Sequence, residues 1–491
     1  KECDWSSDVC SSDLTFMFGF VQVFNILVKV VQNKLIAIIL GAHGMGIIGL
    51  FDSSLNLLKT GLSLGISQTA VRDVAEAKGN NDFNSFSRTI SLTNLLLRLT
   101  SIIGIIVTIF LSPFLSKWSF GNNNYTLSYI WLSFVVGLNI ISEGKLAILK
   151  GMRHINALAK ASMIGSVVGL FSAVPFYYLF GEGGIVPSLI ISALSGLFFS
   201  NYFVSRVKYE NFKLSAKEII HLSSPVLKMG IALMSATFLG NLTSLAIATY
   251  IRKIGGLEDV GFYNAGITIM NGYFGVVITA LATDYYPRIA AVNNNNLLLE
   301  KELNQQSMVS IILMLPIIVL FHILLPFFIK ILYTNEFLPI IDFVRIGVLG
   351  TLITIISNQV DMILIAKYNT RIFILISIFY RFFELFLAFI LFPFLGLLGM
   401  GVVLLLRGIF HLIIMTFTIR KLYNIKFSNS FIKVVAIVMI FTLLSLLVST
   451  FEILLIRYLA GFVLFLLSVI FSYKISINKL GIKIHNFKRI N

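Results

Sequence analysis

Charged residues are scarce in this sequence of 491 residues. Asp, Glu, Lys and Arg make up only 12% of it, whereas 57% of the residues are hydrophobic. A soluble domain of this size carries about twice that charged fraction. Apolar runs of about 18 residues or more recur along the chain, and each is long enough to cross the hydrocarbon core of a bilayer. The composition therefore predicts a multi-pass membrane protein.

Cysteine occurs only at the start of the chain. The 2 cysteines, Cys3 and Cys10, both lie in the segment KECDWSSDVCSSDL. This segment is acidic, repeats Ser-Ser-Asp and lacks an initiator methionine. We interpret residues 1–14 as a non-native artefact, and no cleavable signal peptide can be read beside them. Without this segment the chain has no cysteine, so neither a disulfide nor a cysteine-bound metal is expected.

Motifs for nucleotide or metal chemistry are also missing. No G-x-x-x-x-G-K-[ST] segment occurs, so ATP hydrolysis by this chain is not expected. The 6 histidines are scattered, none at H-E-x-x-H spacing, and we predict no metal site and no cofactor. Gly44 to Gly49 matches G-x-G-x-x-G, but apolar runs longer than about twenty residues flank it. We interpret this segment as a tight turn between two membrane helices.

The net charge of +16 would suit a nucleic-acid-binding protein if the cations were clustered. They lie instead in alternate connections between the apolar spans, as the orientation signals of membrane proteins do. No nucleic-acid partner is therefore predicted.

Hydropathy divides the chain into about fourteen spans, each too long to be a barrel strand of about ten residues. The predicted fold class is an all-α integral membrane protein with two related six-helix lobes and two extra C-terminal helices. The predicted spans are 15–40, 47–70, 89–111, 126–149, 157–180, 185–205, 225–250, 260–284, 306–330, 339–366, 370–391, 396–419, 431–450 and 452–473. The predicted parts after residue 14 are an N-lobe at 15–205, a cytoplasmic linker at 206–224, a C-lobe at 225–419, helices thirteen and fourteen within 420–473, and a basic cytoplasmic tail at 474–491.

The connections between spans carry an orientation signal. Those after even-numbered spans hold about 21 Lys and Arg residues, against about 4 after odd-numbered spans. The positive-inside rule therefore places the even connections and both termini in the cytoplasm. A missed or extra helix would scramble this alternation, so the contrast supports the predicted count. The longest connections have about twenty residues, too few for a soluble catalytic domain.

One stretch, residues 33–77, has a counterpart at residues 256–291. Both contain glycines followed by a largely apolar helix, and both end in an Arg followed by small residues. Two related halves in one membrane protein are the usual build of a transporter. The alignment pairs Gly49 with Gly261, Asp52 with Asn264 and Lys59 with Asn271.

Ionisable side chains near the middle of a span are the candidates for function. Each costs about 2.5–3.5 kcal/mol to insert, so it faces a wet cavity, pairs with a neighbouring helix or extends to an interface. Arg381 and Glu384 are three residues apart on one helix face, so we expect them to pair. Asp361 or Glu384 could instead serve as a protonation or cation site. The candidate substrate-path residues are Lys29, Lys59, Arg98 and Arg407.

These candidates are mostly cations, which predicts an interior suited to an anionic substrate or head group. Other charged residues lie close to span ends, and we interpret them as interfacial. They are Glu143, Lys145, Asp342 and Arg345.

The segment from Leu40 to Ala77 resembles a known family. It reads LGAHGMGIIGLFDSSLNLLKTGLSLGISQTAVRDVAEA. It is similar to the polysaccharide-transport branch of the multidrug/oligosaccharidyl-lipid/polysaccharide (MOP) exporter superfamily, and to the O-antigen translocases in particular. The likeness lies in the LG..G.G..G turn, the GLSLGI helix end and the R..AEA exit, and the predicted helix number agrees with it.

The resemblance implies a V-shaped, two-lobed bundle that works by alternating access as a flippase, not as an enzyme. Its implied substrate is an undecaprenyl-pyrophosphate-linked oligosaccharide, such as an O-antigen repeat unit. This substrate would move from the cytoplasmic to the periplasmic leaflet of the bacterial inner membrane, and the basic residues would hold its pyrophosphate. The implied partners are the lipid-linked oligosaccharide, the lipid bilayer, a polysaccharide polymerase and chain-length proteins.

Three other functions stay open. A cation-coupled drug or metabolite exporter of the same superfamily would have a dominant acid in the N-lobe, for which Asp52 is the candidate. A peptidoglycan-precursor flippase would share the fold and the basic cavity. A membrane glycan polymerase or ligase typically has a large periplasmic loop, and the longest odd-numbered connection here has about fourteen residues.

Overall fold

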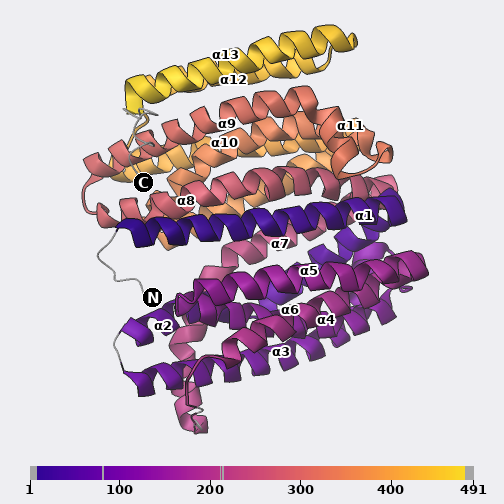
Figure 1. Cartoon of the computed structure of the whole chain (residues 1–491), viewed down its shortest axis with the longest axis vertical. Coiled ribbons are helices and arrows are strands. Elements are labelled where there is room, and N and C mark those ends of the chain that lie inside the picture. Colours follow the sequence, from indigo (N-terminus) through magenta and orange to yellow (C-terminus); the bar gives the residue numbers. More distant parts are fainter. Residues whose placement is uncertain (1–7, 80–81, 211, 213–214, 481–491) are drawn as a thin grey trace. The chain divides into compact units, whose positions relative to one another are not determined.

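The computed structural model describes residues 8–79, 82–210, 212 and 215–480. All regular elements in this part of the chain are helices, as the hydropathy predicted. They form two compact units, one ending at Asn264 and the other beginning at Ala265. Figure 1 shows the helices coloured along the chain. The predicted artefact and the predicted basic tail lie partly outside the described residues.

Unit 1 is built from long helices joined by short connections. Its elements are α1 (Asp8–Leu62), α2 (Ile66–Gly79), α3 (Phe83–Phe120), α4 (Thr126–Gly151), α5 (Ile155–Phe180), the 3-10 turn η1 (Gly181–Gly184), α6 (Ile185–Ser205) and most of α7 (Ala216–Ile267). α4 packs against α3 and α6, and α5 packs against α6 and α1. The short α2 packs against α3 and α4.

Unit 2 contains the remaining helices. They are the π-helix η2 (Thr268–Tyr273), α8 (Phe274–Ala291), α9 (Asn296–Leu332), the 3-10 turn η3 (Asn335–Ile340), α10 (Ile341–Ala366), α11 (Thr370–Tyr423), α12 (Asn429–Ser449) and α13 (Leu454–Leu480). α10 packs along α11, and the two C-terminal helices α12 and α13 pack against α9.

Three of the longest helices are interrupted at a glycine. Gly41 in α1, Gly256 in α7 and Gly396 in α11 have φ angles of 63°, 91° and 56°. Glycine adopts such angles without the steric cost that a Cβ imposes. The predicted turn at Gly44 to Gly49 is therefore misplaced by a few residues: the break is at Gly41, and the G-x-G-x-x-G segment itself is helical.

Ten helices among the described residues are long and apolar enough to cross a membrane, so the chain is a multi-pass membrane protein. Four of the ten have 43 to 56 residues. Each of these four contains a break, at Gly41, at η1, at Gly256 or at Gly396. The count of fourteen spans stays a prediction. Each broken helix is one continuous helix by its backbone hydrogen bonds, whereas the hydropathy of the sequence divides it into two spans.

The backbone supports the repeat but changes its register. The broken positions Gly41 and Gly256 correspond, and at the same spacing Gly46 corresponds to Gly261. A Cβ on Gly46 would lie 2.0 Å from the carbonyl oxygen of Leu257, and a Cβ on Gly261 would lie 2.0 Å from that of Ala42. The two segments thus pack reciprocally, and the predicted pairing of Gly49 with Gly261 is three residues off.

The span predicted at 47–70 also ends earlier than expected. α1 stops at Leu62, the chain turns at Leu64 and Gly65, and α2 begins at Ile66. The GLSLGI segment therefore contains the end of α1, a turn at residues 63–65 and the first residue of α2. Lys78, near the end of α2, donates a hydrogen bond to the carbonyl oxygen of Met152 at 2.8 Å, which fixes α2 beside the end of α4.

Several hydroxyl groups inside the apolar spans form hydrogen bonds, mostly to backbone carbonyls. The Ser54 hydroxyl donates to the carbonyl oxygen of Leu50 one turn earlier and lies 2.9 Å from the Tyr129 hydroxyl. Thr100 and Thr108 likewise donate to carbonyls one turn back. Such bonds let hydroxyl groups enter a membrane span without losing hydrogen bonds to water.

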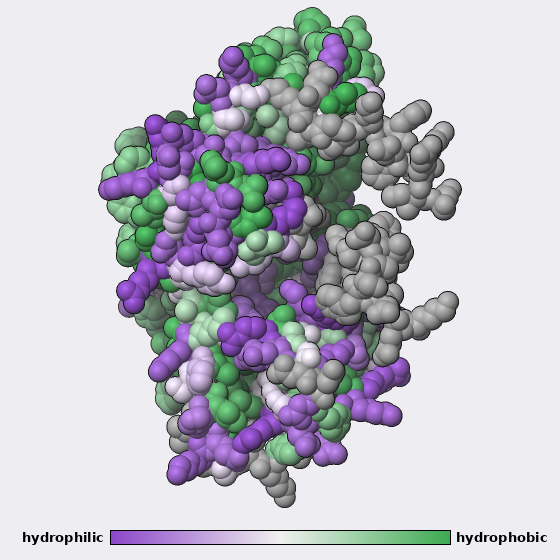
Figure 2. Space-filling model, turned by 90° about the vertical axis from the view of Figure 1, so that its left-hand side faces the viewer, coloured by the Kyte–Doolittle hydropathy of each residue, from purple (hydrophilic) through white to green (hydrophobic). Residues whose placement is uncertain are grey.

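Hydrophilic side chains gather on the face that Figure 2 shows, which is the side of the molecule on which α2 lies in Figure 1. In unit 1, exposed cations follow or end the helices α2, α4 and α6. They are Lys78, Lys150, Arg153 and Arg206. These are cations of the connections that the sequence places in the cytoplasm.

Candidate functional site

A small polar cavity of about 150 Å³ lies within unit 1, among α1, α4 and α6. Because one water molecule fills about 30 Å³ of liquid, the cavity has room for a phosphate-sized group but not for a whole saccharide. Its polar lining consists of Asp52, Asn56, Lys59, Asn139 and Ser192. Of these residues, Asn139 and Ser192 were not indicated by the sequence, because an isolated amide or hydroxyl inside a span carries no charge signal.

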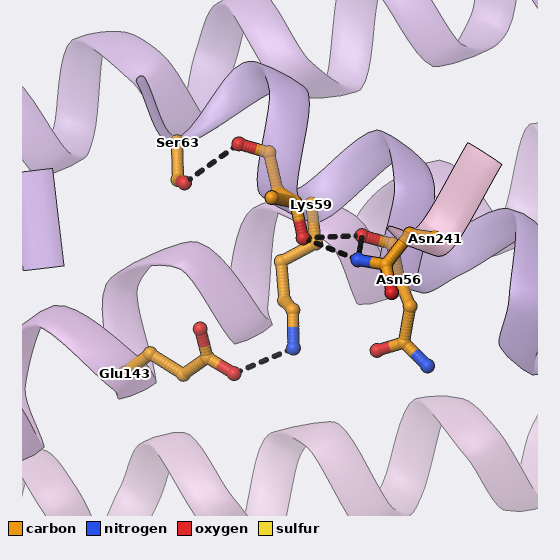
Figure 3. A network of polar contacts seen from close by, with 6 residues as sticks. Asn56, Lys59, Ser63, Glu143 and Asn241 are labelled. Carbon is orange, nitrogen blue, oxygen red and sulfur yellow. Dashed lines mark hydrogen bonds and ion pairs between the residues drawn. The ribbon is translucent and has the colours of Figure 1, made fainter. Parts of the chain in front are cut away.

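Lys59 extends from α1 toward Glu143 on α4, as Figure 3 shows. Its Nζ lies 2.6 Å from Oε1 of Glu143. The Glu143 side chain is 48% exposed and that of Lys59 is 21% exposed. Glu143, which the sequence analysis interprets as interfacial, is thus the ion-pair partner of Lys59. These two residues are far apart in the sequence, so no local pattern could reveal the pair.

Asn241 on α7 holds the backbone and side chains beside Lys59 (Figure 3). Its Nδ2 donates to the carbonyl oxygen of Asn56 at 3.2 Å and to Oγ1 of Thr60 at 2.8 Å. Thr60 in turn donates to the same carbonyl oxygen of Asn56 at 2.7 Å. These bonds fix the turn of α1 that carries Lys59. Sequence reasoning missed Asn241, which is a neutral residue in a span without a motif.

Asp52 lies within electrostatic reach of two cations, Lys29 and Lys59. Lys29 precedes the break at Gly41 by about as many residues as Asp52 follows it, so the reversal of α1 brings the two residues together. The structure thus gathers Lys29, Asp52, Lys59 and Glu143 around one polar region, and their formal charges balance.

A second charged cluster lies in unit 2, within α11. Glu384 accepts from Arg381 at 2.8 Å through Oε2 and from Arg407 at 2.8 Å through Oε1. The Glu384 side chain is only 5% exposed. The expected pairing of Arg381 with Glu384 is present, and Arg407, expected to be free, joins it because α11 doubles back at Gly396.

Asp361 on α10 lies beside this part of α11. Its Oδ1 is 3.2 Å from Nε2 of His411, and the His411 ring lies 4.3 Å from the ring of Tyr380. The role of Asp361, Arg381 and Glu384 in ion coupling stays a prediction.

Arg98 does not join either cluster. It lines a different cavity in unit 1 together with Lys145, among α3, α4 and α6. The expectation of one basic interior is therefore corrected. Lys59 and Arg407 each have an acidic partner, whereas the described residues that line the cavity of Arg98 and Lys145 include no acid.

The family model described as "Polysaccharide biosynthesis protein" matches residues 35–342. The chain belongs to this family of polysaccharide biosynthesis proteins. The match includes the segment from Leu40 to Ala77, on which the sequence-based resemblance rested, and the family that the resemblance predicted is confirmed. No curated protein sequence matches the chain.

Solved structures show that this polysaccharide biosynthesis protein shares its fold with transporters. An inward-facing multidrug resistance MATE family transporter of the MOP superfamily has a TM-score of 0.70 at 15% identity, covering 83% of this chain and 99% of that one. The lipid II flippase MurJ, inward closed, has a TM-score of 0.65 at 15% identity, covering 95% and 99%. The MATE multidrug transporter DinF-BH has a TM-score of 0.63 at 14% identity, covering 86% and 97%.

Proposed function

We propose that the chain is a flippase that moves an undecaprenyl-pyrophosphate-linked oligosaccharide, such as an O-antigen repeat unit, from the cytoplasmic to the periplasmic leaflet by alternating access. The family match over residues 35–342 carries the proposal, because it connects a multi-pass membrane protein with polysaccharide synthesis. The fold shared with a lipid II flippase and with MOP transporters supports lipid-linked transport over glycan polymerisation. The bacterial inner membrane, with both termini cytoplasmic, is the proposed location.

The charges around Asp52 favour this function over export of a cationic drug. A drug exporter of this plan needs an acid whose negative charge is available to the substrate. Asp52 instead lies near Lys29 and Lys59, so its charge is compensated. Amides and a hydroxyl complete the cavity lining, and such groups form hydrogen bonds to phosphate oxygens or sugar hydroxyls.

We further propose that the Lys59–Glu143 pair opens when the substrate binds. A half-exposed ion pair contributes about 0–1 kcal/mol, so it is easily exchanged. A pyrophosphate carries more negative charge than one carboxylate, and a charge-assisted hydrogen bond to it is stronger. Lys59 would then hold the pyrophosphate while Glu143 turns toward water.

A charge swap separates this binding role from a structural one. Lys59→Gln is expected to lower flippase activity about tenfold or more, the loss of one hydrogen bond to a charged group. The double variant Lys59→Glu/Glu143→Lys restores an ion pair but places the cation on α4, so activity should stay low. Surface glycan on a blot, in cells that lack the native gene, measures the activity. The matched control is Lys160→Gln, which removes an exposed lysine on α5 and should leave the glycan unchanged.

If the swapped variant regained the full glycan level, Lys59 would serve only as a structural partner of Glu143. Wild-type glycan in Lys59→Gln would also overturn the proposed phosphate contact. Protein levels in the membrane, measured on the same samples, correct for folding defects.

The function itself is tested by a lipid extract from cells that lack the gene. We expect undecaprenyl-pyrophosphate-linked repeat units to accumulate while the surface polymer is lost, and mass analysis would name the sugar. A normal glycan profile together with altered sensitivity to cationic dyes would contradict the flippase and favour the drug exporter. Accumulated peptidoglycan precursor would point to the precursor flippase instead.

A further inference from the structure

A second cavity in unit 1, of about 390 Å³, lies on a different face of α4 from the Lys59 cavity. α4 lines it with Ile141 and Lys145, whereas Val135 and Asn139 of α4 line the Lys59 cavity. The other polar groups of this second cavity are Arg98 and Asn94 on α3 and Asn201 on α6.

Two cations meet in this cavity, and no acid is among the described residues that line it. The charges of Arg98 and Lys145 act on each other, and Lys145 is only 9% exposed. Like charges held together in partly dry surroundings repel, and an anion between them relieves the repulsion. The cavity therefore has the charge of an anion site, while the Lys59 region is balanced.

The surface around the cavity is apolar and exposed. Ile102 on α3 and Phe198 on α6 are 55% and 64% exposed. In a multi-pass membrane protein, exposed side chains of this kind face the hydrocarbon chains of lipids. The cavity that holds the two cations thus lies beside a lipid-facing surface.

The cavity lies at the level of one leaflet. Lys145 is close to the end of α4 at Gly151, and Asn201 is close to the end of α6 at Ser205. These are the ends that lead into the cation-rich connections. Another cavity, of about 630 Å³ and lined by the opposite ends of α4 and α6, has Glu182 as its charged residue.

We propose that the Arg98–Lys145 cavity binds the phosphate of an anionic phospholipid in the leaflet that adjoins the cation-rich connections. The guanidinium group can bind two phosphate oxygens at once, and the ammonium group supplies a compact second charge. Asn94 and Asn201 offer amide donors to the remaining head-group oxygens. Phe198 and the leucines of α6 contact the first carbons of an acyl chain, which a soluble phosphate would lack. Basic pockets between membrane helices are suited to such lipids.

Lipid retention by the purified full-length chain tests this proposal without any flippase assay. The chain in detergent is titrated with phosphatidylglycerol, with phosphatidylcholine or with inorganic phosphate, and native mass spectrometry counts the bound molecules. We expect phosphatidylglycerol to bind in preference to phosphatidylcholine. Arg98→Gln and Lys145→Gln should each weaken phosphatidylglycerol binding about fivefold. Lys145→Arg should keep it, and so should Lys117→Gln, which removes an exposed cation near the other end of α3.

Equal binding of the charged and the neutral phospholipid by the native chain would overturn the proposal, and this comparison needs no variant to fold. Unchanged phosphatidylglycerol binding in both glutamine variants would overturn it as well. Inorganic phosphate bound as tightly as the lipid would show a soluble anion as the ligand, which also contradicts the proposal. None of these results bears on whether the chain transports a saccharide.

Discussion

Replacing Gly46 with alanine is expected to destabilise the protein by about 3 kcal/mol and to abolish its transport activity. The added Cβ would lie 2.0 Å from the carbonyl oxygen of Leu257, and a backbone atom cannot move aside as a side chain can. The segments of α1 and α7 that follow Gly41 and Gly256 would therefore have to separate. A thermal melt of the purified protein measures the loss, expected as a fall of about 5–10 °C in the midpoint.

The contact between Gly261 and Ala42 allows the same prediction to be tested from the other segment. Gly261→Ala should have the same effect, because its Cβ would meet the carbonyl oxygen of Ala42 at 2.0 Å. The double variant should lose little more than either single one, since both remove the same close approach. Gly183→Ala is the matched control, because no atom of the described residues lies within 4 Å of its added Cβ. Fully additive losses, or a Gly46→Ala melt equal to that of the control, would contradict the close packing.

Replacing Glu384 with glutamine should destabilise unit 2 by about 3–5 kcal/mol. Arg381 and Arg407 both donate to its carboxylate, and all three side chains are at most 25% exposed. Removal of the one anion leaves two guanidinium charges together in surroundings of low polarity. The yield of folded protein and its melting midpoint should both fall, and Glu452→Gln, an exposed acid in a connection, serves as the control.

A combined replacement distinguishes a structural cluster from a substrate-binding one. Arg381→Met, Glu384→Leu and Arg407→Met together remove all three charges and approximate their volumes, which is often neutral or stabilising. We expect the triple variant to recover the stability lost in Glu384→Gln. Recovered stability with wild-type surface glycan would assign the cluster to structure alone and remove Arg407 from the proposed substrate path. A triple variant less stable than Glu384→Gln would contradict the unpaired-charge explanation.

The class of protein could be predicted from composition because the hydropathy of a whole span, rather than of any single residue, decides whether it crosses a membrane. Runs of about twenty apolar residues must be helical in a bilayer, whatever packs against them. The breaks at Gly41, Gly256 and Gly396 were placed within a few residues by the gaps between apolar runs. The register of the repeat was missed because the alignment paired Gly49 with Gly261, whereas the backbone correspondence depends on which glycine interrupts each helix, Gly41 or Gly256.

The candidate site was harder to predict, since partners are set by packing between distant segments. Lys59 was found because a charge inside a span is conspicuous, but its partner Glu143 lies near a span end, where charges are common. Lys145 was likewise assigned to an interface, although the fold buries it beside Arg98. Asn241 carries no charge, and only the structure shows that it fixes the turn of α1 beneath Lys59.

The most direct test of the proposed function is translocation by the purified protein. Lipid-linked saccharide from cells that lack the gene is placed in proteoliposomes, and a membrane-impermeant glycosidase reports how much of it is exposed outside. The proposal predicts that the wild-type protein makes nearly all of the substrate accessible, that protein-free vesicles expose about half, and that Lys59→Gln slows the transfer about tenfold. Exposure that stays at the protein-free level with the wild-type protein, under an imposed ion gradient and without one, would contradict a flippase.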